Sequence, residues 1–145
     1  MTDRIILCDT REQCAPPLPV GFVYERARLS EADYTTPALV DVARIERKAP
    51  LDLIGSLTSG RERFEREADR LRAFPFRCIV VEASAAAVSR LGRIHPNALI
   101  GSLASLHARW GLPTIFLESP EAAGRYICGV LRRLEEERDA GRWAA

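Results

Sequence analysis

Residues 45–52 read Ile-Glu-Arg-Lys-Ala-Pro-Leu-Asp, and they close an apolar run that predicts a strand over residues 39–48. Side chains on a strand alternate between its two faces. Glu46 and Lys48 are therefore expected to share one face, with Arg47 on the other. Pro50 suits the first turn of a helix that follows at once and that Gly60 would end. The stretch thus predicts a strand that delivers an acid and a base together at a strand-to-helix junction.

This pairing of charges suits metal-dependent cleavage of phosphodiesters. Asp33 lies upstream and could arrive from a neighbouring strand, so that Asp33 and Glu46 together hold Mg²⁺ or Mn²⁺ through oxygen ligands. Lys48 could position the attacking water or stabilise the charge of the pentavalent phosphorane. Arg47 could pair with Asp52 or contact phosphate directly. Glu-x-Lys also occurs by chance, and a solvated strand end remains the alternative.

Composition gives a frame for this interpretation. The 145 residues suit one domain, and a hydrophobic content of 47% is enough for a core. The 21 basic and 20 acidic residues give a net charge of +1, so any nucleic-acid surface must be local. Lys48 is the only lysine. The four cysteines form no Cys-x-x-Cys pair and are interpreted as reduced thiols, mostly in the core, of a cytoplasmic protein.

The remaining pattern predicts one α/β domain over residues 1–145. Further strands are expected at residues 4–8, 22–29, 77–81 and 113–117, and residues 35–37 are expected to be irregular, in a possible hairpin. Further helices are expected at residues 61–74, 84–91, 96–110 and 120–134, with fraying beyond residue 135. Three strands followed by alternating helices and strands indicate a mixed sheet flanked by helices. No signal peptide or membrane-spanning helix is expected.

The predicted helix over residues 61–74 is densely charged. Five arginines alternate with four acidic residues on it, which favours a solvated, salt-bridged face. A track for DNA phosphates is the alternative. The arginines are Arg61, Arg63, Arg66, Arg70 and Arg72, and the acids are Glu62, Glu65, Glu67 and Asp69.

Several motifs together resemble the nuclease domain of the XPF-type structure-specific endonucleases, which include the archaeal Hef nuclease. Glu46-Arg47-Lys48 followed by Asp52 matches the family's E-R-K-x-x-x-D signature, within a variant of the PD-(D/E)-x-K fold. Residues 6–12 match its D-x-R-E opening through Asp9, Arg11 and Glu12, and Asp33-Tyr34 matches its G-D-Y motif. The resemblance runs from about residue 4 to residue 83.

The resemblance implies a restriction-endonuclease-like fold and Mg²⁺- or Mn²⁺-dependent cleavage of DNA at branched or flap structures. It implies Asp33, Glu46 and Lys48 as catalytic residues, with Asp33, Glu46 and Asp9 as metal ligands. Arg11, Glu12, Arg47 and Asp52 would be supporting or phosphate-binding residues.

The resemblance also implies a homodimer, or a heterologous partner that targets the domain to DNA. We expect the apolar stripes of the last two helices to supply the interface of a homodimer. Ala32 stands where the family has glycine, and we expect no helix-hairpin-helix domain in residues 1–145. Two alternatives remain: a non-catalytic DNA-binding or partner subunit on the same fold, and an unrelated α/β domain with an accidental Glu-Arg-Lys. The arginine-rich composition fits a bacterial or phage-derived protein.

Overall fold

A six-stranded mixed sheet forms the centre of the computed structural model, which describes residues 2–143. The strands are β1 (Arg4–Asp9), β2 (Phe22–Ala27), β3 (Tyr34–Thr35), β4 (Ala43–Lys48), β5 (Phe76–Val81) and β6 (Thr114–Phe116), in the order β2-β1-β3-β4-β5-β6. The short β3 pairs antiparallel with both β1 and β4, and all other pairs are parallel. Five strands therefore point the same way, and Asp9 and Lys48 end at the same edge of the sheet.

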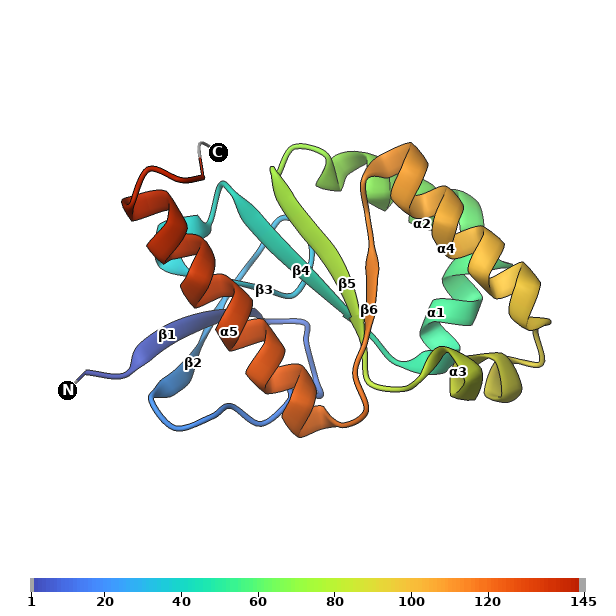
Figure 1. Cartoon of the computed structure of the whole chain (residues 1–145), viewed down its shortest axis with the longest axis horizontal. Helices are drawn as coiled ribbons and strands as arrows, with labels where there is room; N and C mark the ends of the chain where they lie inside the picture. Colours follow the sequence, from blue (N-terminus) through green and yellow to red (C-terminus); the bar gives the residue numbers. More distant parts are fainter. Residues whose placement is uncertain (1, 144–145) are drawn as a thin grey trace.

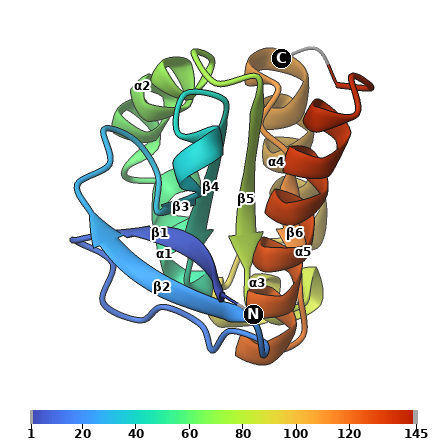
Figure 2. The ribbon, with the colours of Figure 1, turned by 90° about the vertical axis from the view of Figure 1, so that its left-hand side faces the viewer.

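Helices cover both faces of the sheet. They are α1 (Pro50–Leu57), α2 (Arg61–Leu71), α3 (Ala85–Gly92), α4 (Pro96–Trp110) and α5 (Pro120–Asp139). Figure 1 shows α5 on one side of the central strands and the other four helices on the opposite side. In Figure 2, turned by 90°, α2 and α5 lie on opposite sides of β4 and β5. The predicted fold class, a mixed sheet flanked by helices, is confirmed.

Two hydrophobic cores follow from this layering. On the α5 side, Ile45 of β4 and Val80 of β5 pack with Ile127 and Leu131 of α5, all of them fully buried. On the other side, Ile79 and Val81 of β5 pack with side chains of α1 to α4. Alternation along β4 then assigns Ile45 and Arg47 to the α5 side and Glu46 and Lys48 to the side of α1 and α2. The predicted separation of Arg47 from its two neighbours is confirmed.

Local sequence accounts for several helix ends. The hydroxyl of Ser119 accepts a hydrogen bond from the N–H of Ala122, and Pro120 occupies the first position of α5, as the sequence predicts. Gly111 ends α4 in the left-handed conformation, with φ of 63°. That conformation favours glycine because it has no Cβ. These caps fix the two helices that frame β6.

Some element boundaries differ from the predicted ones. The third predicted strand begins at Ala43 rather than residue 39, because Pro37–Leu39 form a 3-10 turn. Residues 34 and 35 form β3, where the sequence predicts irregular structure for residues 35–37. The charged helix ends at Leu71 rather than residue 74, and α5 continues to Asp139 although its last turns are expected to fray. Gly60 precedes α2 instead of ending α1.

Two further expectations concern cysteines and membranes. Cys8, Cys78 and Cys128 are buried free thiols, whereas Cys14 is exposed. Burial raises the pKa of Cys78 and Cys128 to about 12, so both are held as neutral thiols. Within residues 2–143, no helix combines the length and the apolar character that crossing a bilayer requires.

Candidate active site

Asp33 lies between the two strands that carry the other acidic residues of the site. Its N–H donates to the carbonyl of Ile45 on β4 at 3.0 Å, and its carbonyl accepts from the N–H of Asp9 on β1 at 2.8 Å. Its side chain is turned toward β4, where Oδ2 accepts a hydrogen bond from the N–H of Arg47 at 2.8 Å. The short strand β3, which follows directly, therefore holds the Asp33 carboxylate between β1 and β4.

Glu46 is the centre of a group of three carboxyl groups. Its side chain, only 8% exposed, is hydrogen-bonded to Asp33 and to Glu67 of α2. Burial raises the pKa of Glu46 well above its usual range, and the bonds to Glu67 and Asp33 raise it further. Burial also raises the pKa of Asp33, against the opposing effect of its hydrogen bonds. The raised pKa values of Asp33 and Glu46 favour their protonated forms in the metal-free protein, and a bound cation would favour the ionised forms.

Asp9 lines the same cavity of about 280 Å³ as Asp33, Glu46 and Glu67. Its oxygens already have partners: Oδ2 accepts from the backbone N–H and from Nε of Arg11, at 3.1 and 2.8 Å, and Oδ1 accepts from the N–H of Leu29 at 2.9 Å. Burial would raise the pKa of Asp9, but these hydrogen bonds lower it below its usual value. Its contacts favour anchoring of the loop before Asp33, and metal ligation by Asp9 stays a prediction.

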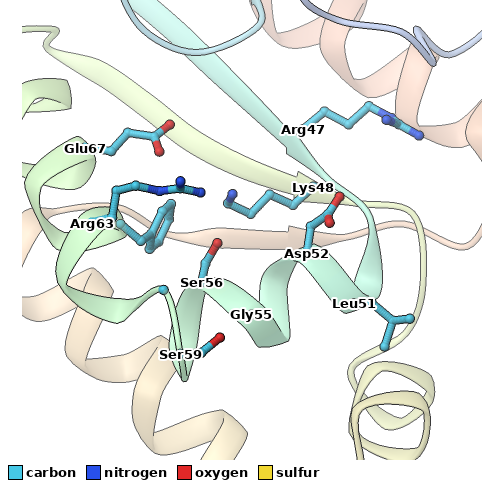
Figure 3. Close-up of a pocket in the computed structure, with 11 residues that line it drawn as sticks. Arg47, Lys48, Leu51, Asp52, Gly55, Ser56, Ser59, Arg63 and Glu67 are labelled. Atoms are coloured by element: carbon cyan, nitrogen blue, oxygen red, sulfur yellow. The ribbon is translucent and has the colours of Figure 1, made fainter.

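Lys48 lies on the same face as Glu46 and points into a second cavity, of about 350 Å³. Its Nζ is 4.7 Å from the centroid of the Phe64 ring, close enough for a cation–π contact that holds the amine in place. Asp52 lines this cavity from the first turn of α1, and Glu67 lines both cavities. Figure 3 shows Lys48 extending toward α2 while Arg47 extends the opposite way.

Arg47 belongs to a separate charged network on the α5 face. Its Nε donates to Glu82, directly after β5, and its Nη1 lies 3.7 Å from Oε1 of Glu12, after β1. Glu12 also accepts a hydrogen bond from the hydroxyl of Tyr34 at 2.9 Å. The expected pair between Arg47 and Asp52 is wrong, because Arg47 pairs with Glu82 and Glu12 while Asp52 lines the cavity that Lys48 enters. The bond to Glu82 raises the pKa of Arg47, so its charge is permanent.

The donors that converge on this site are suited to a hard cation. Carboxylate oxygens are the ligands that Mg²⁺ and Mn²⁺ prefer. Among residues 2–143, no three acidic, histidine or cysteine side chains form a ready-made metal cage. Mg²⁺, however, is commonly held by one or two carboxylates, with waters and substrate phosphates at its other positions. The pair of Asp33 and Glu46, open to a cavity, fits that mode of binding.

Sequence reasoning missed Glu67 as a member of the site. It was one of four acids on a charged helix, and the pattern favoured a solvated face for all of them. The available signal was the spacing from Phe64, which is buried, because residues three apart lie on the same side of a helix. That spacing turns Glu67 toward the sheet, whereas Glu62 and Asp69 are exposed.

The fold and the carboxyl pair beside a lysine define a restriction-endonuclease-like nuclease domain. The ERCC4 domain model matches residues 9–130, so the chain belongs to the ERCC4 domain family and is an XPF-type nuclease domain. A search of curated proteins finds no match.

Two solved structures carry the same fold. XPF from Aeropyrum pernix in complex with DNA is 25% identical, with a TM-score of 0.74, over 92% of this chain and 66% of that one. A second structure of XPF from Aeropyrum pernix is 24% identical, with a TM-score of 0.77, over 97% of this chain and 65% of that one. The chain thus spans just under two thirds of the length of these relatives.

Proposed function

We propose that this chain is a Mg²⁺- or Mn²⁺-dependent endonuclease that hydrolyses phosphodiester bonds of DNA at branched or flap structures. The observation that carries the proposal is the carboxyl pair of the half-buried Asp33 and the buried Glu46, with Lys48 on the same face of β4 as Glu46. DNA as the substrate is supported by family membership and by the relative whose structure is titled as a complex with DNA.

The residues divide the chemistry between them. Asp33 and Glu46 would hold the cation, which when bound neutralises phosphate charge and lowers the pKa of water. The Lys48 amine, restrained by Phe64, would lie beside the charge that develops on the phosphorane oxygens. Asp9 and Arg11 would act through Asp33, because they fix the loop that precedes it. The burial of Glu46 strengthens its attraction to a cation, since fewer waters compete for the carboxylate.

The test is cleavage of a labelled flap DNA in the presence of Mg²⁺. Wild-type protein should nick it, whereas Glu46→Gln and Lys48→Ala should each lower kcat by about 100-fold or more, in line with the loss of a charge that acts in the transition state. Glu65→Gln is the matched control, because Glu65 is a glutamate on the same side of the sheet that pairs with Arg61 at the surface. Full activity in Glu46→Gln would contradict the assignment. Wild-type binding without cleavage would favour the non-catalytic subunit instead.

We further propose that the active form is a homodimer or a complex with a DNA-targeting partner. The apolar stripe of α5 is largely used in the core, through Ala123, Ile127 and Leu131. The outer side of α4 keeps Ile100, which is 58% exposed. A homodimer would therefore rest on α4 more than on α5. Light scattering at micromolar concentration should give twice the monomer mass, and a monomer would leave the heterologous partner as the alternative.

A further inference from the structure

The cavity that Lys48 enters, next to the three carboxyl groups of Asp33, Glu46 and Glu67, contains two cations that face each other. Lys48 reaches in from β4 and Arg63 from α2, and Figure 3 shows their charged ends pointing toward one another, with the Ser56 side chain beside them. Among residues 2–143, no carboxylate forms an ion pair with either side chain. Two other arginines of α2 each have one, since Arg61 pairs with Glu65 and Arg70 with Glu31, and Arg72, directly after α2, pairs with Asp69.

Arg63 is exposed, so water screens most of the repulsion between these two like charges, and an anion bound between them would interact favourably with both. The two carboxylates on the cavity wall do not fill that role. Glu67 is hydrogen-bonded to Glu46, and Asp52 forms no ion pair within residues 2–143. The hydroxyls of Ser56 and Ser59 line the same cavity and are donors that suit phosphate oxygens. Beside its two carboxylates, the wall thus offers a phosphate two cations that form no ion pair within residues 2–143, together with two hydroxyl donors.

The position of this cavity identifies the anion. Glu46 and Lys48 are two residues apart on one strand face, and Glu67 lines both this cavity and the one that contains Asp33 and Glu46. With Lys48 at the scissile phosphate, a DNA strand that passes Asp33 and Glu46 would bring an adjacent phosphate toward Arg63 and Ser56 of the same cavity. We propose that this cavity binds the backbone phosphate next to the one being cut, with Arg63 as a positioning residue. The inference rests on the proposed function, because it assumes a DNA strand at Glu46.

The test measures binding and cleavage of the same flap DNA by Arg63→Gln. Arg66→Gln is the matched control: it makes the same charge change on the same helix, but Arg66 lines a different depression, with Trp110. In EDTA, Arg63→Gln should weaken binding about five- to tenfold. It should also reduce the slope of log K against log salt by about 0.7 to 0.9, the value for one phosphate. With Mg²⁺, KM should rise by a similar factor while kcat stays within about twofold. Arg66→Gln should behave as the wild type in both assays.

Three outcomes would overturn the inference. Equal losses in Arg63→Gln and Arg66→Gln would show a diffuse charge effect without a site. Wild-type binding and KM in Arg63→Gln, with cleavage by the wild type intact, would remove the phosphate site and leave the proposed function standing. In a parallel titration with inorganic phosphate, binding by the wild type that Arg63→Gln loses while its DNA binding is unchanged would make this a site for free anions. Failure of the wild type to bind or cut DNA would instead remove both proposals.

Discussion

Ala32 adopts a left-handed backbone conformation, with φ of 64°, directly before Asp33. A residue with a Cβ pays about 1 to 2 kcal/mol for this conformation. Ala32 is also buried, and its methyl group packs in the core beneath the α1–α2 layer. Backbone strain next to a functional side chain is a recurrent feature of active sites. Here it turns the chain so that Asp33 enters β3 with its carboxylate toward Glu46.

Substitutions at Ala32 should therefore separate strain from packing. Ala32→Gly relieves the strain but loses a buried methyl group, worth about 0.8 kcal/mol, and adds freedom to the unfolded chain, worth about 0.4 to 1 kcal/mol. Its free energy of unfolding should stay within about 1 kcal/mol of the wild type. Ala32→Val should lose about 1 to 3 kcal/mol, because a β-branched residue fits this conformation poorly. Urea unfolding measures both, and a valine variant as stable as the glycine variant would contradict the account.

Glu46 gives the metal-free protein a defined pH dependence. Burial and the bonds to Glu67 and Asp33 raise its folded-state pKa, so the folded protein keeps a proton that the unfolded chain has already released. The stabilising effect is complete below the unfolded pKa, near 4.3, and is lost as the pH rises through the folded pKa. Stability in EDTA should accordingly fall between mildly acidic and alkaline pH.

Glu46→Gln removes this titration, so its advantage over the wild type in free energy of unfolding should grow as the pH rises. Urea unfolding in EDTA at several pH values measures it, with the surface variant Glu65→Gln as the control that should run parallel to the wild type. At the upper end of the pH range, Mg²⁺ or Mn²⁺ should raise the free energy of unfolding of the wild type and leave that of Glu46→Gln unchanged. A difference between Glu46→Gln and the wild type that is independent of pH would contradict the raised pKa of Glu46.

At the scale of elements, β4 contributes charged side chains to two different surfaces of the sheet. Its alternation sends Glu46 and Lys48 toward α2 and sends Arg47 into the network with Glu12 and Glu82. Arg47 ties the end of β4 to β5 and to the loop after β1, at a position where its side chain is only 14% exposed. The end of β4 is therefore stabilised by the ion pairs of Arg47 on one face and carries the candidate catalytic residues Glu46 and Lys48 on the other.

Replacement of Arg47 by methionine should cost about 3 kcal/mol, because it leaves the nearly buried carboxylates of Glu12 and Glu82 without their cation. The double variant Arg47→Met/Glu82→Gln should recover part of that loss, since one of the two unpaired charges is removed. Denaturant unfolding of these two variants and of Glu82→Gln completes a double-mutant cycle, which gives the interaction energy between Arg47 and Glu82. Additive losses would mean that Arg47 and Glu82 do not interact, against the geometry.

At the scale of the whole molecule, local patterns predicted most of the elements and both faces of β4. Period-two alternation fixed Glu46 and Lys48 on one face, and Ser119 with Pro120 fixed the start of α5. The parallel pairing of β1 with β2 was beyond local pattern, because it depends on how the connection of residues 10–21 packs, with Ala15 and Leu18 against the core on the α5 side. β3 has two residues, too few to show alternation.

Only part of the candidate site could be predicted from the sequence, because the rest depends on tertiary contacts that local patterns do not show. Asp33, Glu46 and Lys48 carry a motif, and the fold brings their strands together. Glu67 and Arg63 come from a helix whose arginines and acids look alike in sequence, and only the packing of Phe64 beneath Lys48 orients them. Assignment of the partners of Arg47 likewise required the tertiary structure, since Glu82 is 35 residues away.

The central claim is that Asp33 and Glu46 together bind the divalent cation of a nuclease. The most direct measurement is anomalous diffraction from a crystal soaked in Mn²⁺, for the wild type and for Glu46→Gln. The account predicts a peak between the Asp33 and Glu46 carboxylates in the wild type and none there in the variant. A Mn²⁺ peak held elsewhere, with these two carboxyls still hydrogen-bonded to each other, would contradict it.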